Sequence, residues 1–515
     1  MREFVLSGDA GAPGDGLPPI DDARFEIAPG GRPRTLRRTW LDTFDWRLFR
    51  AGLTLELVAR RGSAELVLTG RDGELAATEP AAGQLRWPGL IDELPLGPLR
   101  EHLAPVVGVR ALLPVVRATS VLSEHRALNT DHKTIALLTR DTMTLTQPKR
   151  SATPTRITVG ALRGYQAQAS RIAAALEAAP GITSAASSPF EAALSAAGRR
   201  PGDYSSKIDV RLTGAMPAGL ALATVLGSLF DTVQVNMPGT IGDIDTEFLH
   251  DLRVAVRRTR SVLKMASRAL PDSMVSQYAP EFRWLGDLTT PTRDLDVYLL
   301  GYSGMAARLL AANGSELEPF HEYLARERAA AQRQLTRGLR SERFAQLASG
   351  WRQDLERVAA APGKRPVTGA FAARRIAKAH QQVLLRGAAI DAAAPPQALH
   401  DLRKRCKELR YALEVFASLH DPAEQWRAVN ELKALQDCLG EFQDTEVQQA
   451  ELRAFARRML ADRSAPAETL LAMGEIAAAL ARRQQAARSE FAGRFAEFAS
   501  PHGRARITAL TKAAA

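Results

Sequence analysis

The sequence predicts an α+β protein in which a strand-rich N-terminal domain precedes an all-helical domain of two repeats. Three observations predict this fold class. Short segments of alternating or β-branched apolar residues are concentrated in the first 146 or so residues, between clusters of Gly, Pro, Asp and Asn. The second half is rich in Ala and Arg, which favour helices. A single offset of 150 residues relates two segments of that half.

Strands are expected first along the chain. The apolar runs that predict them are at residues 4–6, 53–58, 65–69 and 134–138. A helix follows from about residue 165 to 178, and Pro180-Gly181 ends it. A cluster of Gly, Arg, Pro and Asp at 198–203 marks the start of an inter-domain linker.

The chain from about residue 217 onward favours helix almost throughout. Breaks that contain Pro or Gly interrupt it at 238–239, 271–272, 291, 313–314, 362–363, 395–396 and 466. Long segments between short breaks are typical of a helical bundle. We therefore expect one domain at 1–200, a linker at 201–215, and a helical domain at 216–505 with repeats at about 216–360 and 364–505.

The charge balance indicates an anionic partner. The 515 residues carry a formal net charge of +11, and 45% of them are hydrophobic, which is ordinary for a globular protein. An arginine-rich genome is the alternative explanation of this charge. Two cysteines are too few for a disulfide framework, and no signal peptide or uncharged membrane segment is evident, so we expect a reducing cytosol.

The internal repeat is the strongest signal in the sequence. The segment 249–253, LHDLR, recurs as 399–403. The same offset matches Leu285 with Leu435, Asp287 with Asp437, Asp294 with Asp444 and Val297 with Val447. One ungapped offset across some 50 residues predicts two copies of a helical unit, packed about a pseudo-two-fold axis.

Each copy carries a basic stripe beside its apolar stripe. On a helix, the apolar residues at 249, 252, 256 and 263 share one face, and the cations lie about one residue further around. The basic stripes consist of His250, Arg253, Arg257, Arg260 and Lys264 in the first copy, and of His400, Arg403, Lys407 and Arg410 in the second. Charges at this position are expected to point along a seam between helices or into a groove.

Like charges gathered in one seam repel one another, at roughly 1 kcal/mol per close exposed pair. Two interpretations explain how they are tolerated. Acidic side chains inside the bundle could neutralise them, with Asp294, Asp296, Asp437 and Asp444 as candidates. A bound polyanion is the functional alternative, and arginine suits it because a guanidinium donates in a fork to phosphate oxygens.

These motifs resemble the CHAD family, the conserved-histidine α-helical domain. The segments HDLRxxxRRxR from 250, RDLDV from 293, HDLRxxxKxLRY from 400 and LQxxLGxxxD from 435 are similar to its motifs, in order. The resemblance implies two four-helix-bundle-like repeats around a basic cleft that binds inorganic polyphosphate, often at polyphosphate granules. The matching residues are His250, Arg253, Arg257, Arg260, His400, Arg403, Lys407 and Arg410.

Further cations of the site come from outside these motifs. We add Lys264 from the first stripe, and Arg374, Arg375 and Lys378 from the helix upstream of the second signature. The corresponding helix of the first copy, at about 220–235, has no Lys or Arg. We therefore expect a lopsided basic surface and stronger binding by the second half.

The N-terminal part resembles a CYTH domain, the antiparallel, β-barrel-like triphosphate-tunnel fold. The segment 42–55, DTFDWRLFRAGLTL, is similar to its second-strand motif. The catalytic groups are depleted: the opening ExExK motif retains only Glu3, Glu56 and Val58 replace an arginine pair, and Thr69 replaces a lysine. Triphosphate hydrolysis needs Mg²⁺ held by carboxylates and a cationic clamp, so we expect a degenerate, non-catalytic module.

The function predicted from the sequence is thus non-catalytic binding of inorganic polyphosphate, with no catalytic residues, metal or cofactor. A triphosphate or polyphosphate hydrolase acting through the N-terminal domain is one alternative. A non-specific nucleic-acid binder is another, disfavoured because few aromatic residues lie among the cations. No membrane partner is expected, and the sequence leaves the oligomeric state open.

Overall fold

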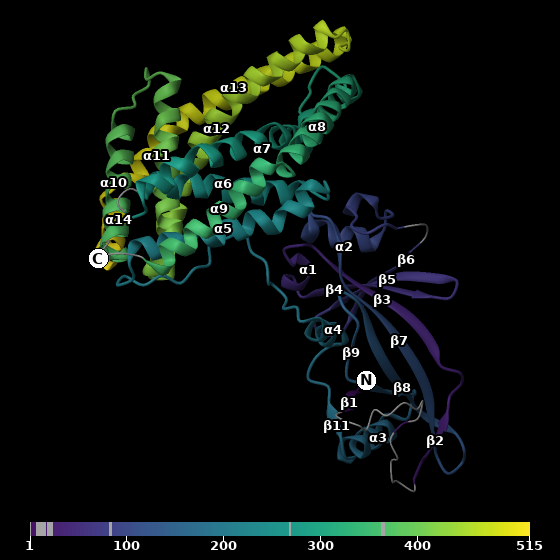
Figure 1. Ribbon diagram of the computed structural model, residues 1–515. Coiled ribbons are helices and arrows are strands. Elements are labelled where there is room, and N and C mark those ends of the chain that lie inside the picture. The colour runs from purple at the N-terminus through teal and green to yellow at the C-terminus, as the bar shows by residue number, and fades with distance from the viewer. Residues whose placement is uncertain are drawn as a thin grey trace. The chain divides into compact units, whose positions relative to one another are not determined.

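The computed structural model describes residues 2–6, 17, 24–81, 85–266, 269–361 and 366–514. The chain divides into two compact units, Met1–Ser205 and Ser206–Ala515. The first is built on a β-sheet and the second is helical, as Figure 1 shows. The predicted break at 362–363 and Ser7, the last residue of the altered ExExK motif, lie outside the described residues.

The first unit is a single antiparallel sheet with short helices. Its strands are β1 (Arg2–Leu6), β2 (Glu26–Pro29), β3 (Arg34–Asp42), β4 (Leu53–Arg60), β5 (Ser63–Gly70), β6 (Leu75–Pro80), β7 (Leu113–Leu128), β8 (Thr134–Gln147), β9 (Ser151–Ala152), β10 (Arg156–Ala161) and β11 (Ile182–Ser184). Its helices are α1 (Arg47–Arg50), the 3₁₀ turn η2 (Ile91–Glu93), α2 (Pro98–Val107), α3 (Gln166–Ala178) and α4 (Pro189–Ala197).

The antiparallel sheet expected for the N-terminal domain is confirmed, and it is open and not closed into a barrel. Its strand order is β11-β1-β10-β8-β7-β3-β4-β5-β6, with β2 added to β7 and β9 to β8. Among the described residues, β11 and β6 form its two edges and do not pair with each other. Closure would require these edges to hydrogen-bond.

The long hairpin of β7 and β8 forms the middle of the sheet. Asn129 sets its turn, because its side-chain oxygen accepts hydrogen bonds from the backbone of Asp131 (3.1 Å) and Lys133 (2.8 Å). Helix α3 buries Ile172 and Leu176 against β1, β8 and β10. The predicted strands at 4–6, 53–58, 65–69 and 134–138 and the helix at 165–178 are confirmed.

Among its described residues, the second unit holds five α-helices from each repeat. The first repeat has α5 (Ala218–Ile241), α6 (Thr246–Met265), α7 (Asp272–Ala306), α8 (Glu318–Leu339) and α9 (Glu342–Ala360), with the 3₁₀ turn η3 (Gly314–Leu317). The second has α10 (Thr368–Ala388), α11 (Pro396–Val415), α12 (Pro422–Ala461), α13 (Ala467–Phe498) and α14 (Pro501–Ala514), with η4 (Ala417–Leu419).

The two repeats obey the predicted pseudo-two-fold symmetry. Helices α10, α11 and α12 each begin 150 residues after α5, α6 and α7. Where the repeats meet, Ala218 N donates to Pro366 O (2.9 Å) and Thr368 N donates to Met216 O (2.8 Å). A shift of 150 residues exchanges these two hydrogen bonds, so the pseudo-axis passes between them.

Two expected breaks are wrong. Pro238 lies inside α5, and Pro291 lies inside α7, which continues to Ala306. A proline removes one backbone donor and disfavours helix, but packing on a long helix can outweigh that local cost. The breaks at 271, 313, 395 and 466 are confirmed, because each of these residues precedes the first residue of a helix.

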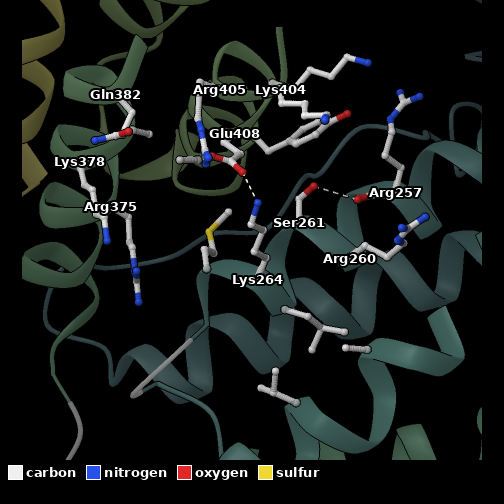
Figure 2. A pocket seen from close by; sticks show the side chains of 18 of the residues that line it. Arg257, Arg260, Ser261, Lys264, Arg375, Lys378, Gln382, Lys404, Arg405 and Glu408 are labelled. Atoms are coloured by element: carbon white, nitrogen blue, oxygen red, sulfur yellow. Dashed lines mark hydrogen bonds and ion pairs between the residues drawn. The ribbon is translucent and has the colours of Figure 1, made fainter. Parts of the chain in front are cut away.

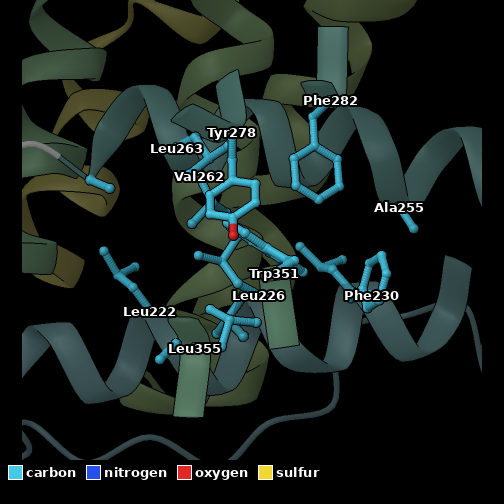
Figure 3. Close-up of a cluster of buried hydrophobic side chains, with 14 of the residues drawn as sticks. Leu222, Leu226, Phe230, Ala255, Val262, Leu263, Tyr278, Phe282, Trp351 and Leu355 are labelled. Atoms are coloured by element: carbon cyan, nitrogen blue, oxygen red, sulfur yellow. The ribbon is translucent and has the colours of Figure 1, made fainter. Parts of the chain in front are cut away.

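The core of the first repeat surrounds Trp351 of α9, as Figure 3 shows. Its ring meets Tyr278 edge-on at a centroid distance of 4.8 Å and Phe282 at 4.9 Å. Leucines of α5 and α6 complete this cluster, and Phe371 and Phe416 of the second repeat also pack into it. The repeats therefore share core residues and form one compact unit.

Helix α5 is long and apolar enough to cross a membrane by length and composition, although the sequence suggested no such segment. In the structure, 61% of its apolar window is buried inside the bundle. Val225, Leu226 and Phe230 all belong to the core of the first repeat. The apolar composition of α5 is therefore explained by its position as a core helix.

Candidate anion-binding pocket

A pocket of about 800 Å³ lies where α6 and α7 of the first repeat meet α10 and α11 of the second. Figure 2 shows side chains of these helices around it. Of the described residues that line the pocket, nine are basic and one, Glu408, is acidic. The basic residues are Arg257, Arg260, Lys264, Arg283, Arg375, Lys378, Lys404, Arg405 and Lys407.

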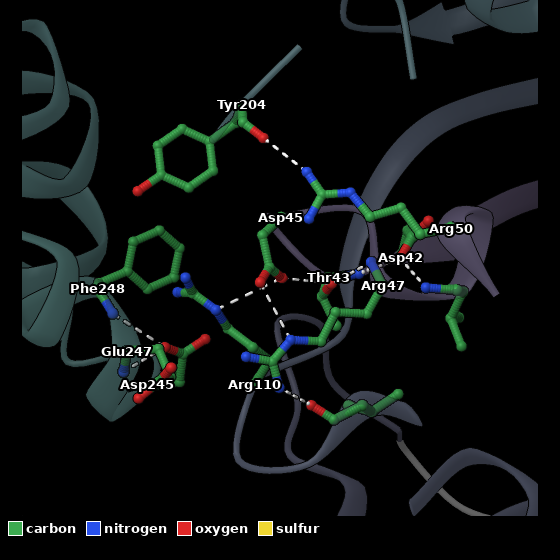
Figure 4. Close-up of polar contacts among 12 residues, drawn as sticks. Asp42, Thr43, Asp45, Arg47, Arg50, Arg110, Tyr204, Asp245, Glu247 and Phe248 are labelled. Atoms are coloured by element: carbon green, nitrogen blue, oxygen red, sulfur yellow. Dashed lines mark hydrogen bonds and ion pairs between the residues drawn. The ribbon is translucent and has the colours of Figure 1, made fainter. Parts of the chain in front are cut away.

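The amphipathic pattern of α6 and α11 explains why cations line this pocket. Leu252 and Val256 of α6, and Leu402 and Leu409 of α11, are buried in the two repeat cores. The basic stripes lie beside these apolar stripes, so burial of the apolar residues turns the cations toward the seam between α6 and α11. Asp245 precedes the first residue of α6 and caps this helix, because its side chain accepts hydrogen bonds from Glu247 N (2.9 Å) and Phe248 N (3.2 Å). Figure 4 labels these three residues.

The structure places six of the twelve predicted site residues in the pocket. These are Arg257, Arg260, Lys264, Arg375, Lys378 and Lys407. Five of the pocket cations form no ion pair with a carboxylate of the described residues: Arg257, Arg260, Arg283, Lys378 and Lys407. An anion could therefore bind them without first breaking an ion pair.

The outer ends of the basic stripes have partners of their own. Arg253 lies 3.8 Å from Asp294, and its counterpart Arg403 lies 2.9 Å from Asp444. These two ion pairs occupy equivalent positions in the two repeats. Neutralisation by acidic side chains, the structural alternative considered from the sequence, thus applies to this outer part of each stripe, although Asp294 (43% exposed) and Asp444 (60% exposed) do not lie inside the bundle.

The remaining predicted residues are not among the described residues that line the pocket. Arg410 pairs with Glu414 (2.7 Å), and the His400 ring contacts the side-chain oxygen of Gln443. Arg374 is exposed on α10 and donates to Ala370 O of its own helix (3.2 Å). Burial, followed by Arg293 and Arg257, lowers the pKa of His250, so this imidazole is neutral at pH 7.

Crowding of positive charge is evident at Lys407. Burial, Arg403 and Arg257 lower the pKa of its ammonium group from 10.5 to about 8, although Asp444 acts in the opposite direction. Arg257 belongs to α6 and Lys407 to α11, and a shift of 150 residues relates them. The two basic stripes therefore approach each other where the repeats meet.

Three pocket cations were missed from the sequence: Arg283, Lys404 and Arg405. Arg283 could have been found, because Lys433 stands 150 residues later and preserves the charge. Lys404 and Arg405 have no basic counterpart, since residues 254 and 255 are Val and Ala. The pocket is one-sided, because α10 supplies Arg375 and Lys378 where α5 has Val225 and Ser228.

The first unit has its own cluster of charged groups within the sheet. Arg38 donates to Glu56 (2.9 Å) and to Asp141 (3.2 Å), and Arg156 donates to Glu3 (2.9 Å). Glu56 stands where the family resemblance implied an arginine, and it pairs with a cation instead of adding one. No group of three or more His, Cys, Asp or Glu among the described residues could hold a metal ion.

The motif at 42–55 runs from the end of β3 through helix α1 to the start of β4. Buried Asp42 accepts hydrogen bonds from the backbone of Thr43 (2.7 Å), Leu48 (3.0 Å) and Phe49 (3.0 Å). Burial raises the pKa of Asp42 to about 6, although these hydrogen bonds act in the opposite direction. Asp45 lies 3.1 Å from Arg47 and 3.6 Å from Arg110. Figure 4 shows both arginines beside this carboxylate. These contacts give the motif a structural role.

The fold and the pocket define a two-repeat α-helical domain with a cationic pocket between its repeats. Residues 224–453 match the family model of the CHAD domain, so the helical unit contains a CHAD domain. The N-terminal sheet is consistent with the expected CYTH-like domain, which remains a prediction.

Solved structures similar to this chain include the following two. A CHAD domain from the plant Ricinus communis is 23% identical, covers 59% of this chain and 96% of its own, and has a TM-score of 0.45. PptA from Streptomyces chartreusis is 19% identical, covers 54% of this chain and 99% of its own, and has a TM-score of 0.42. No curated protein matches the chain.

Proposed function

We propose that the helical unit binds inorganic polyphosphate, without hydrolysing it, in the pocket between α6, α7, α10 and α11. The observation that carries the proposal is the excess of nine basic residues over one acidic residue among the described residues of the pocket. Such an excess in one pocket is unfavourable unless an anion neutralises it. The CHAD domain supports polyphosphate as that anion.

The geometry favours a chain of phosphates over a single one. The pocket cations come from four helices, and Arg253 and Arg403 continue the basic stripes beyond it. One phosphate could contact only a few of them. A polyphosphate carries charge on each repeating unit and can contact cations on several helices together. Its binding displaces counterions, so affinity is expected to fall steeply as salt rises.

Competition with nucleic acid tests this assignment. Tyr411 is the one aromatic residue among the described residues of the pocket, and proteins that bind single-stranded nucleic acid use several aromatics for base stacking. We therefore expect labelled long-chain polyphosphate to stay bound when single-stranded or duplex DNA is added at equal phosphate concentration. Displacement by either DNA would favour a nucleic-acid binder. Phosphate release from polyphosphate with Mg²⁺ or Mn²⁺ would contradict binding without turnover.

Proton uptake on binding is a second expected result. In the free protein the pKa of Lys407 is about 8, and a bound anion raises it toward its usual value. Binding at pH 8 is therefore expected to take up about half a proton per site, because Lys407 is about half protonated before binding. Titration calorimetry in two buffers of different ionisation enthalpy measures this uptake.

The matched control is Lys407→Arg, because a guanidinium stays charged across this range. In this variant the difference in heat between the two buffers should disappear while binding persists. Affinity of the unaltered protein should also fall as pH rises through 8, since the uncharged amine no longer attracts phosphate. Equal heats in both buffers for the unaltered protein would contradict the role of Lys407.

A further inference from the structure

Glu408 of α11 is the one acidic side chain among the described residues of the pocket. It bridges the two repeats, because one carboxylate oxygen accepts from Lys264 of α6 and the other accepts from Arg405 of α11 (2.8 Å). Figure 2 shows Lys264 pointing toward Glu408 across the pocket. Two oxygens of one phosphate could engage the same two cations in the same way.

A second bridge of the same design lies outside the pocket. Glu414 of α11 accepts from Arg258 of α6 (3.1 Å) and from Arg410 of α11 (2.7 Å). A shift of 150 residues relates position 258 to 408 and position 264 to 414, so the pseudo-two-fold axis exchanges the two cross-repeat ion pairs. The chain thus provides an internal comparison for Glu408.

The two bridges differ in their exposure. The side chains of Arg258 and Glu414 are 14% and 17% exposed, and Arg258 also donates to Ser206 O (2.8 Å). Lys264 is 69% exposed, and it has no other ion pair with a carboxylate of the described residues. The Glu414 bridge is therefore held in place by its surroundings, whereas an ion in the pocket can compete for the Lys264 end of the Glu408 bridge.

We propose that Glu408 is a built-in competitor of the anion, and this inference rests on the proposed function. In the free protein its carboxylate occupies two of the nine pocket cations, and a bound polyphosphate displaces it from them. An anion of low charge gains little from this exchange, because it replaces one carboxylate with another single charge. A polyphosphate chain that also contacts Arg257, Arg283 or Lys378 gains more binding free energy. Glu408 therefore raises the negative charge that a ligand must carry in order to bind.

The experiment compares Glu408→Gln with Glu414→Gln in the intact protein, using long-chain polyphosphate and single-stranded DNA as probes. We expect Glu408→Gln to bind polyphosphate roughly three- to tenfold more tightly, since exposed ion pairs are weak. Two further cations become available to the ligand in this variant. The slope of log affinity against log salt should therefore become steeper by about one. Glu414→Gln should bind both probes within about twofold of the unaltered protein.

The outcomes separate this inference from the function on which it rests. If the unaltered protein binds polyphosphate and Glu408→Gln binds it equally or more weakly, Glu408 positions Lys264 and the inference is wrong. If the unaltered protein binds only DNA, the proposed function fails, and tighter DNA binding by Glu408→Gln still supports competition. Binding of neither probe by either protein would overturn both. Thermal unfolding of each variant establishes that it is folded.

Discussion

A variant with Arg257→Gln, Arg283→Gln and Lys378→Gln is expected to lose about 100-fold or more in affinity for long-chain polyphosphate. These cations line the pocket from α6, α7 and α10, and none pairs with a carboxylate of the described residues. A hydrogen bond to a charged group contributes roughly 1.5–3 kcal/mol. Even if each of these three exposed side chains contributes only about 1 kcal/mol to the binding free energy, their combined loss lowers the affinity by about 100-fold. Titration calorimetry measures the change.

The salt dependence of the same variant gives a second readout. The slope of log affinity against log salt is expected to fall by about two, because three cations no longer displace counterions. The matched control is Arg333→Gln, Arg337→Gln and Arg340→Gln, which removes equal charge from exposed residues at α8. The polyphosphate affinity of this control should stay within a few-fold of that of the unaltered protein. Equal losses in both variants would show that net charge, and not the pocket, governs binding.

Replacement of Trp351 by alanine is expected to lower the free energy of unfolding of the helical unit by about 3–5 kcal/mol. Trp351 is fully buried and contacts Tyr278 and Phe282 through aromatic edges. Its removal leaves a cavity that the close-packed helices around it cannot fill. Denaturant titration followed by circular dichroism at 222 nm measures the loss.

The control for this change is Trp426→Ala, in which the same side chain is removed from a site where it is 64% exposed. This substitution should change the free energy of unfolding by no more than about 0.5 kcal/mol. Similar losses at both positions would contradict the packing described for the first repeat. Polyphosphate affinity, measured well below the unfolding transition, should be retained in both variants, because neither tryptophan lines the pocket.

The architecture of the helical unit was predictable because its signals are local or repeated. Proline and asparagine precede the first residues of several helices, and these breaks were located from the sequence. The 150-residue offset predicted the symmetry that the hydrogen bonds of Ala218 and Thr368 confirm. Pro238 and Pro291 were misleading, because tertiary packing outweighed a local preference.

The site was only partly predictable, because a pocket depends on which helices meet. The stripe pattern gave Arg257, Arg260 and Lys264 without distinguishing them from Arg253, which the structure pairs with Asp294. Lys404 and Arg405 follow no stripe and have no counterpart in the first repeat. Only the packing of α11 against α6 brings them to the pocket.

The N-terminal unit shows a similar limit. Alternating apolar residues predicted several strands. The long strands β3 and β7 were not predicted, because polar side chains interrupt their apolar pattern. The open edges of the sheet depend on strand pairing between distant segments, which no local pattern reports. The pairing of Glu56 with Arg38 explains how a carboxylate is accommodated where the family resemblance implied a cation.

Titration of the intact protein with long-chain polyphosphate at several salt concentrations tests the central claim most directly. We predict saturable binding whose affinity falls at least about 100-fold between 50 and 200 mM salt, as expected when several cations displace counterions. The same titration of the Arg257, Arg283 and Lys378 variant should show the weaker and less salt-dependent binding described above. Absence of binding at low salt, or affinity that does not change with salt, would contradict the claim that this pocket binds a polyanion.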